Sequence, residues 1–87
     1  MINKNSIVIT SANRTAVGSF GKSLKNIPGD ILGSTVITEV IKRSKIKEAD
    51  VDEVIMGQVL TGGTDQNPAR QAAIKSGIPK EKPAYIV

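Results

Sequence analysis

The stretch VIMGQVL (residues 54–60), with the loop TGGTDQ (61–66) and the run NPARQAAIKSG that follows, decides the fold. The first part is a continuous apolar run of the length of a buried strand. Asn67 and Pro68 predict a helix start, because Asn caps a first turn and Pro lacks only an N–H that would be unpaired there. Gly77 predicts the helix end. A strand, a loop and a helix in this order predict one unit of an α/β fold.

Three further segments extend this unit to the order β-α-β-α-β. Residues 7–10, IVIT, form a β-branched run whose two sides both look buried, which predicts a central parallel strand. Apolar residues recur at helical spacing over residues 31–41, with Asp30 as the predicted N-cap. Residues 84–87, AYIV, predict a third strand. We therefore expect an α/β fold with a mostly parallel sheet and helices packed on it, joined by right-handed crossovers.

Glycines and one long polar segment refine this expectation. Gly33 lies inside the first predicted helix and indicates close packing, because glycine lowers helix propensity by about 1 kcal/mol against alanine. Gly57 inside the second strand indicates a bulge or a close backbone approach. Residues 11–29 are too polar and rich in Gly and Pro for a regular element. A loop of this length is typical of a functional segment or of one that a partner covers.

Composition limits the function classes. The chain has 87 residues, enough for one domain at most or part of one, and only two aromatic residues, Phe20 and Tyr85. It has no Cys and no His, which excludes disulfides, cysteine-based zinc sites and the usual neutral-pH acid/base group. The N-terminus does not read as a signal peptide and no segment is long enough to span a membrane, so we expect a cytoplasmic protein without membrane contact.

Charge does not predict a nucleic-acid partner. The formal net charge is +4, and much of it lies where the first helix is predicted to end. Four cations are grouped there: Lys42, Arg43, Lys45 and Lys47. Cations at a helix C-terminus interact favourably with the helix dipole, so a solvated helix end explains them. Nucleic-acid surfaces add stacking aromatic residues, and the chain offers none in this region.

Two local patterns suggest chemistry and have simpler explanations. Residues 16–23, AVGSFGKS, fit a loose phosphate-binding loop with alanine in place of the first glycine. The required helix would have to start at Lys22, but residues 26–29 break the chain soon after, so we interpret the match as chance. The acidic residues Asp50, Asp52 and Glu53 are expected on a solvated turn rather than in a paired-carboxylate site.

The run QNPARQ, placed after an apolar strand, resembles the N-terminal part of thiolases. The opening IVITSANRTAVGSFG (7–21) resembles the first strand and loop of the same family, and residues 51–79 carry the strongest resemblance. It favours thiolases of the acetyl-CoA acetyltransferase type over the related ketoacyl synthases. Two loop positions depart from the family pattern: Ala16 stands where proline is common, and Asp65 where glycine is common.

The resemblance implies the function. Thiolases transfer acyl groups between coenzyme A thioesters, by Claisen condensation or by thiolysis of acetoacetyl-CoA or a 3-ketoacyl-CoA. Their nucleophilic cysteine comes a few residues after the strand that residues 84–87 resemble. Residues 1–87 are then a partial thiolase N-terminal domain that ends just before the nucleophile, without catalytic, cofactor-binding or metal residues of its own and inactive in isolation. The coenzyme A thioester is the substrate of the full enzyme, and the expected partners are the remainder of the chain and further copies in a dimer or tetramer.

Five residues are expected to act in structure or at a subunit interface: Arg14, Gln66, Asn67, Pro68 and Arg70. Arg14 is expected to pair with a carboxylate or with backbone carbonyls, and Arg70 to tie down a loop or a partner chain rather than touch substrate. Two other classes remain open. A non-enzymatic α/β interaction module would be a stable folded monomer by itself, and a phosphate-loop nucleotide binder would be stabilised by nucleotide.

Overall fold

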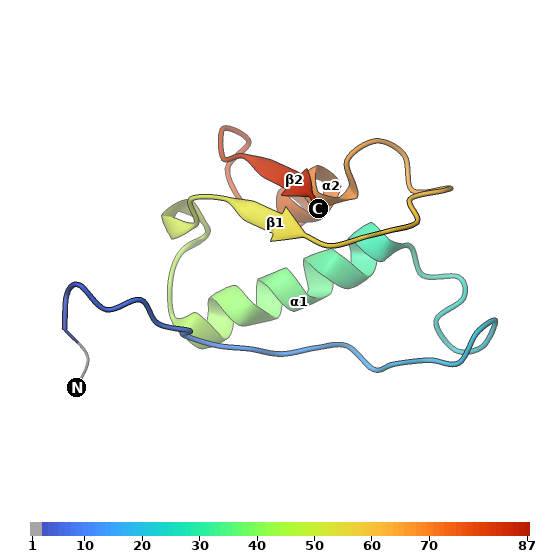
Figure 1. Ribbon diagram of the computed structural model, residues 1–87, viewed down its shortest axis with the longest axis horizontal. Coiled ribbons are helices and arrows are strands. Elements are labelled where there is room, and N and C mark those ends of the chain that lie inside the picture. The colour runs from blue at the N-terminus through green and yellow to red at the C-terminus, as the bar shows by residue number, and fades with distance from the viewer. Residues whose placement is uncertain (1–2) are drawn as a thin grey trace.

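Two helices and a two-stranded parallel sheet form the ordered body of the chain (Figure 1). The computed structural model describes residues 3–87. Its elements follow in the order α1 (Gly29–Ser44), the 3-10 turn η1 (Glu48–Asp50), β1 (Val54–Met56), α2 (Pro68–Lys75) and β2 (Ala84–Ile86). The strands pair in parallel with Val54 opposite Ala84 and Met56 opposite Ile86. The α/β class and the parallel pairing predicted from the sequence are confirmed.

The strand predicted over residues 7–10 does not form. The segment runs beside α1 (Figure 1), and Ile7 and Ile9 are 101% and 89% exposed instead of buried on both sides. Polar side chains at the end of the run hold it against the helix. Ser11 Oγ donates to the carbonyl of Val40 at 3.3 Å, and Asn13 Nδ2 to the carbonyl of Val36 at 3.4 Å. The β-branched residues predicted an extended backbone, and the segment is extended. Their pattern does not specify a neighbouring strand for the segment to pair with.

The strand predicted over residues 54–60 is shorter than expected. β1 ends at Met56, and the ladder with the last segment continues only through two bonds, Val87 N–H to Met56 O and Gln58 N–H to Val87 O. Val59 is 95% exposed, so among residues 3–87 the apolar run beyond Gly57 has no packing partner. A Cβ on Gly57 would meet nothing nearer than the Val87 carbonyl at 4.0 Å. The Met56 and Gln58 bonds to Val87 on either side of Gly57 follow a regular parallel ladder, so the expected bulge is wrong, and no close backbone approach to Gly57 occurs within residues 3–87.

The N-cap of helix α1 lies two residues earlier than predicted. Pro28 is its N-cap and gives no side-chain cap bond, while Asp30 lies inside the first turn and is 4% exposed. The prediction of Asp30 as N-cap is wrong, because the Pro28 carbonyl already accepts the bonds from Ile31 and Leu32 that open the helix. The helix ends at Ser44, and Lys45 closes it in the left-handed region with φ 57°. Lys42 and Arg43 lie in the last turn, as their interpretation as helix-end cations requires.

Small residues bring α1 and α2 together. Gly33 is buried on α1, and a Cβ there would lie 3.2 Å from the Ala72 Cβ and 2.7 Å from the Met56 Cε. The close packing inferred from Gly33 is confirmed. Ala69, Ala72 and Ala73 on α2 are 0%, 0% and 1% exposed. Because these side chains are short, the two helix backbones approach closely, and both stay near the sheet.

The core is small, and one sheet face has no cover within residues 3–87. The buried apolar cluster consists of Ile41, Val54, Ala73 and Ile78. The register partners Ile55 and Tyr85 on the other face are 52% and 42% exposed. The radius of gyration is 14.2 Å, against about 12 Å for a compact domain of this length. The helices and strands therefore position a sheet whose apolar surface is only partly used.

Candidate functional site

Asn67 caps α2 and reaches the second strand at the same time. Its backbone lies in the left-handed region with φ 46°, and its Oδ1 accepts the N–H of Arg70 at 3.1 Å. The predicted N-cap is confirmed. Its Nδ2 donates to the carbonyl of Ala84, the first residue of β2, at 3.0 Å. Pro68 follows at the first helical position and is almost completely buried.

Arg70 holds the chain that enters β2. Its Nη1 donates to the carbonyl of Lys82 at 3.2 Å across a part-buried contact. The carbonyl of Pro83, between these two contacts of α2, accepts the N–H of Val54 from β1 at 3.0 Å. The entry to β2 is thus fixed from α2 on one side and from β1 on the other.

Gln71 fixes the loop of residues 61–66, which connects β1 to α2. Its Nε2 donates to the carbonyls of Thr64 at 3.0 Å and Gln66 at 2.8 Å. The loop turns tightly, with Gly63 at φ 77° and Asp65 at φ 59°. Gln66 itself is exposed and contributes its carbonyl. No role was predicted for Gln71 from the sequence. Its only sequence signal is a glutamine in the first turn after a Gly-rich loop.

We call Asn67, Arg70 and Gln71 the α2 anchor. All three belong to the first turn of one helix, and their side chains bind backbone carbonyls outside it. Four of the five residues predicted from the sequence thus meet at this turn, because Gln66, Asn67, Pro68 and Arg70 are neighbours in the chain. The arrangement contains amides and a guanidinium but no nucleophile. It can hold loops and a strand in place.

Arg14 lies apart from the α2 anchor. Its Nη1 donates to the carbonyl of Thr15 at 3.0 Å, so it pairs with a backbone carbonyl of its own loop. It lines an open groove of about 610 Å³ between its segment and the middle of α1, together with the Thr35 and Thr38 side of that helix. The structure does not bring Arg14 together with the other four predicted residues.

A second polar contact joins the ends of the two helices. The Lys75 ammonium on the last turn of α2 donates to the buried carboxylate of Asp30 on the first turn of α1. This hydrogen bond lowers the pKa of the Asp30 carboxyl below its ordinary value of 3.8; burial works against it, and backbone N–H groups of Asp30 and Ile31 add to the lowering. The Ser76 hydroxyl supports the same junction, because it lies 3.2 Å from the carbonyl of Ser34 on α1 as well as 2.7 Å from the carbonyl of Ala72 in its own helix.

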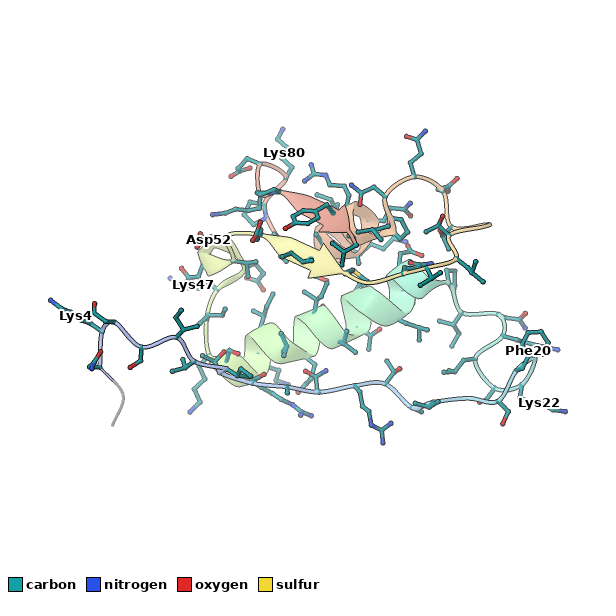
Figure 2. The ribbon with its side chains drawn as sticks, viewed as in Figure 1. Lys4, Phe20, Lys22, Lys47, Asp52 and Lys80 are labelled. Carbon is teal, nitrogen blue, oxygen red and sulfur yellow. The ribbon has the colours of Figure 1, made fainter. Side chains whose placement is uncertain are left out.

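The two local chemical patterns do not form sites in the described part of the chain. Residues 19–27 form successive turns, and Figure 2 shows Phe20 and Lys22 at the outer end of this loop. The helix begins at Gly29 rather than at Lys22, so the strand-loop-helix context of a phosphate loop is missing. The acidic residues near η1 are exposed, and residues 3–87 contain no group of three or more potential metal ligands.

Comparison with known proteins decides the family. The family model described as "Thiolase, N-terminal domain" matches residues 7–87. The chain belongs to the thiolase family. It resembles the Acetyl-CoA acetyltransferase of Cupriavidus necator, with 57% identity over 81 residues that cover 93% of this chain and 21% of that protein. It also resembles the cytosolic Acetyl-CoA acetyltransferase of Rattus norvegicus, with 52% identity over 91% of this chain and 20% of that protein.

A solved thiolase structure supports the same assignment. The crystal structure of the Acat5 thiolase from Ascaris suum in complex with coenzyme A matches with a TM-score of 0.77 and 39% identity, over 79% of this chain and 18% of that one. The thiolase segment described here therefore spans about a fifth of the length of its relatives. The matches to enzymes across most of the chain do not favour the interaction-module alternative. No helix in residues 3–87 is long and apolar enough to cross a membrane.

Proposed function

We propose that this chain is the N-terminal part of an acetyl-CoA C-acetyltransferase, which carries out Claisen condensation or thiolysis of acetoacetyl-CoA or a 3-ketoacyl-CoA. One observation carries the proposal. Relatives named Acetyl-CoA acetyltransferase share 50–57% of their residues with it over 90% or more of the chain. Identity at this level over most of the chain supports a shared activity more strongly than a shared fold alone would.

The chain serves as scaffold in this proposal. Acyl transfer between thioesters needs a nucleophile and groups that move protons. The 87 residues contain neither Cys nor His, so these groups come from the remainder of the enzyme. Arg14 and the residues Gln66, Asn67, Pro68 and Arg70 at the start of α2 then hold loops or contact another subunit. The coenzyme A thioester is the substrate of the full enzyme, and the relative from Ascaris suum was crystallised with coenzyme A.

We also propose the setting of the full enzyme. Residues 1–87 form an incomplete N-terminal domain, and the uncovered Ile55 and Tyr85 of the sheet support this, because a complete domain rarely leaves paired apolar residues open. The full enzyme is cytoplasmic, as the name of the cytosolic rat relative suggests. It assembles as a homo-oligomer, a dimer or a tetramer, and binds neither nucleic acid nor membrane.

A thiolysis assay tests the function. The full-length protein and the 87-residue chain are each incubated with acetoacetyl-CoA and coenzyme A, and loss of the substrate enolate absorbance is followed. We expect turnover with the full-length protein and only the buffer rate with the 87-residue chain. A full-length protein that binds acetoacetyl-CoA without consuming it would contradict the proposed activity. Turnover by the repurified short chain would contradict the scaffold role.

A further inference from the structure

The loop of residues 61–66 lies at the edge of the sheet where ligands of α/β proteins bind. β1 and β2 are parallel, so their carboxyl ends lie at one edge, and the bond from the Gln58 N–H to the Val87 carbonyl joins them there. The loop of residues 61–66 begins just after this point, on the way from β1 to α2 (Figure 1). In open α/β sheets, ligands bind in the crevice outside the carboxyl ends of the strands. The position of this loop relative to β2 therefore bears on any substrate site at that edge.

One helical turn sets that relative position. Gln71 holds the loop through the carbonyls of Thr64 and Gln66, while Asn67 and Arg70 hold the entry to β2 through the carbonyls of Ala84 and Lys82. These four bonds do not contribute to the α2 hydrogen-bond ladder. Only the Oδ1 of Asn67 serves the helix, by capping the Arg70 N–H. The side chains of the α2 anchor therefore do more than start a helix.

We propose that Asn67, Arg70 and Gln71 are positioning residues of the acyl-transfer site: they set the loop of residues 61–66 and β2 at a fixed distance from each other at the carboxyl edge of the sheet. The proposal rests on the proposed thiolase activity. None of the three touches substrate in this role. Their effect on turnover comes through the backbone they hold, and misplacement of a reacting group by about 1 Å lowers rates by up to about a hundredfold.

Substitutions at the three anchor residues of the full-length enzyme separate positioning from folding. Asn67→Asp keeps an oxygen that caps α2 and a residue type that adopts positive φ, but it loses the donor to Ala84. Arg70→Met keeps the apolar stem and loses the donor to Lys82, and Arg70→Lys restores a cation. Gln71→Glu loses the donor to Thr64 and Gln66. Arg43→Ala is the matched control, since Arg43 pairs with Glu39 on exposed α1 surface.

Two measurements read out each variant. Hydrogen–deuterium exchange reports the backbone: the Val54 amide, bonded to Pro83, reports the entry to β2, and the Thr64 amide, bonded to Thr61, reports the loop. Steady-state thiolysis, normalised to folded enzyme, gives kcat and KM. We expect Asn67→Asp and Arg70→Met to speed exchange at Val54, and Gln71→Glu at Thr64, by up to about tenfold. In all three, kcat falls by about tenfold or more while KM changes less, Arg70→Lys recovers part of the loss, and Arg43→Ala matches the wild type.

The outcomes distinguish the proposals. Wild-type kcat in all three anchor variants overturns the positioning role, whatever the exchange shows. A lower kcat with unchanged exchange at Val54 and Thr64 also overturns it, because the residues would then act on substrate directly. If the wild-type enzyme shows no thiolysis at all, the proposed function fails instead, and the exchange data decide alone whether the α2 anchor positions β2 and the loop.

Discussion

Adding one methyl group at Gly33 tests how tightly α1 is packed. In Gly33→Ala the new Cβ would lie 2.7 Å from the Met56 Cε and 3.2 Å from the Ala72 Cβ. The Met56 methyl ends a flexible side chain and is able to turn away, but the Ala72 Cβ is fixed to α2, so the helices must separate by a few tenths of an ångström. Overpacking of this kind costs about 1–3 kcal/mol. Alanine in place of glycine returns about 1 kcal/mol of helix propensity. We expect a net loss of about 1 kcal/mol.

The measurement is urea unfolding of the full-length enzyme, with the midpoint of Gly33→Ala compared with two reference variants. Gly62→Ala is the matched control, because a Cβ there meets nothing within 4 Å and the backbone needs no positive φ; its midpoint should stay near the wild type or rise slightly. Met56→Ala removes the nearest contact, so Gly33→Ala should cost less in that background than in the wild type. A higher midpoint for Gly33→Ala in both backgrounds would show that propensity outweighs packing and refute the reasoning.

Three further predictions concern the cap, the buried carboxylate and the isolated chain. Asn67→Ala in the full-length enzyme should lower the free energy of unfolding by about 1 kcal/mol, since it removes the cap of α2; unchanged thermal unfolding would contradict this. The hydrogen bond from Lys75 lowers the pKa of Asp30 in the folded protein. The Asp30–Lys75 pair therefore stabilises the fold fully above the unfolded pKa near 3.8, and this stabilisation is lost as the pH falls through the lower folded pKa. The difference in urea midpoint between wild type and Lys75→Met should accordingly shrink at acid pH, and a pH-independent difference would rule out the carboxylate as its cause. The isolated 87-residue chain should be poorly folded or associated, because Ile55, Tyr85 and Phe20 leave apolar surface open; a sharp two-state transition from a monodisperse 9.2 kDa species in circular dichroism and light scattering would contradict it.

Features decided by near neighbours in the chain were predictable. Asn67 and Arg70 are three residues apart, so the cap of α2 could be inferred from the pair Asn67-Pro68 alone. Gly77 ends α2 with φ 84°, as its place after the helix predicted. Gly33 indicated a close contact because glycine inside an apolar helix stripe has no local advantage. For Asn67 and Gly77 the physical reason lies within about one helical turn. The partners of Gly33, Met56 and Ala72, lie far away in the chain, so the sequence indicated the close contact but not what it is made with.

Features that depend on distant parts of the chain were not predictable. Asp30 and Lys75 are 45 residues apart, and no spacing rule links them. Local pattern favoured Asp30 as a cap, whereas its burial against α2 depends on how the helices cross. Gln71 has the same character, because its role depends on the path of a Gly-rich loop. The entry to β2 brings together Val54, Pro83 and Arg70, and periodicity assigns each of them only to its own element.

Residues 7–10 show why pattern and pairing are separate questions. IVIT has the β-branched composition of a buried strand, and the segment is extended, yet Ile7 and Ile9 lie almost fully in solvent. Full burial of one such side chain is worth about 1.5–3 kcal/mol, whereas each of the three bonds that hold the segment against α1, from Thr10, Ser11 and Asn13, is worth about 0.5–1.5 kcal/mol. The contacts seen along α1 are therefore weaker than the burial that the sequence is suited to. A surface that buried Ile7 and Ile9 would therefore stabilise this segment more than its hydrogen bonds to α1 do. For this reason we expect residues 7–10 to be ordered differently when more of the thiolase is present.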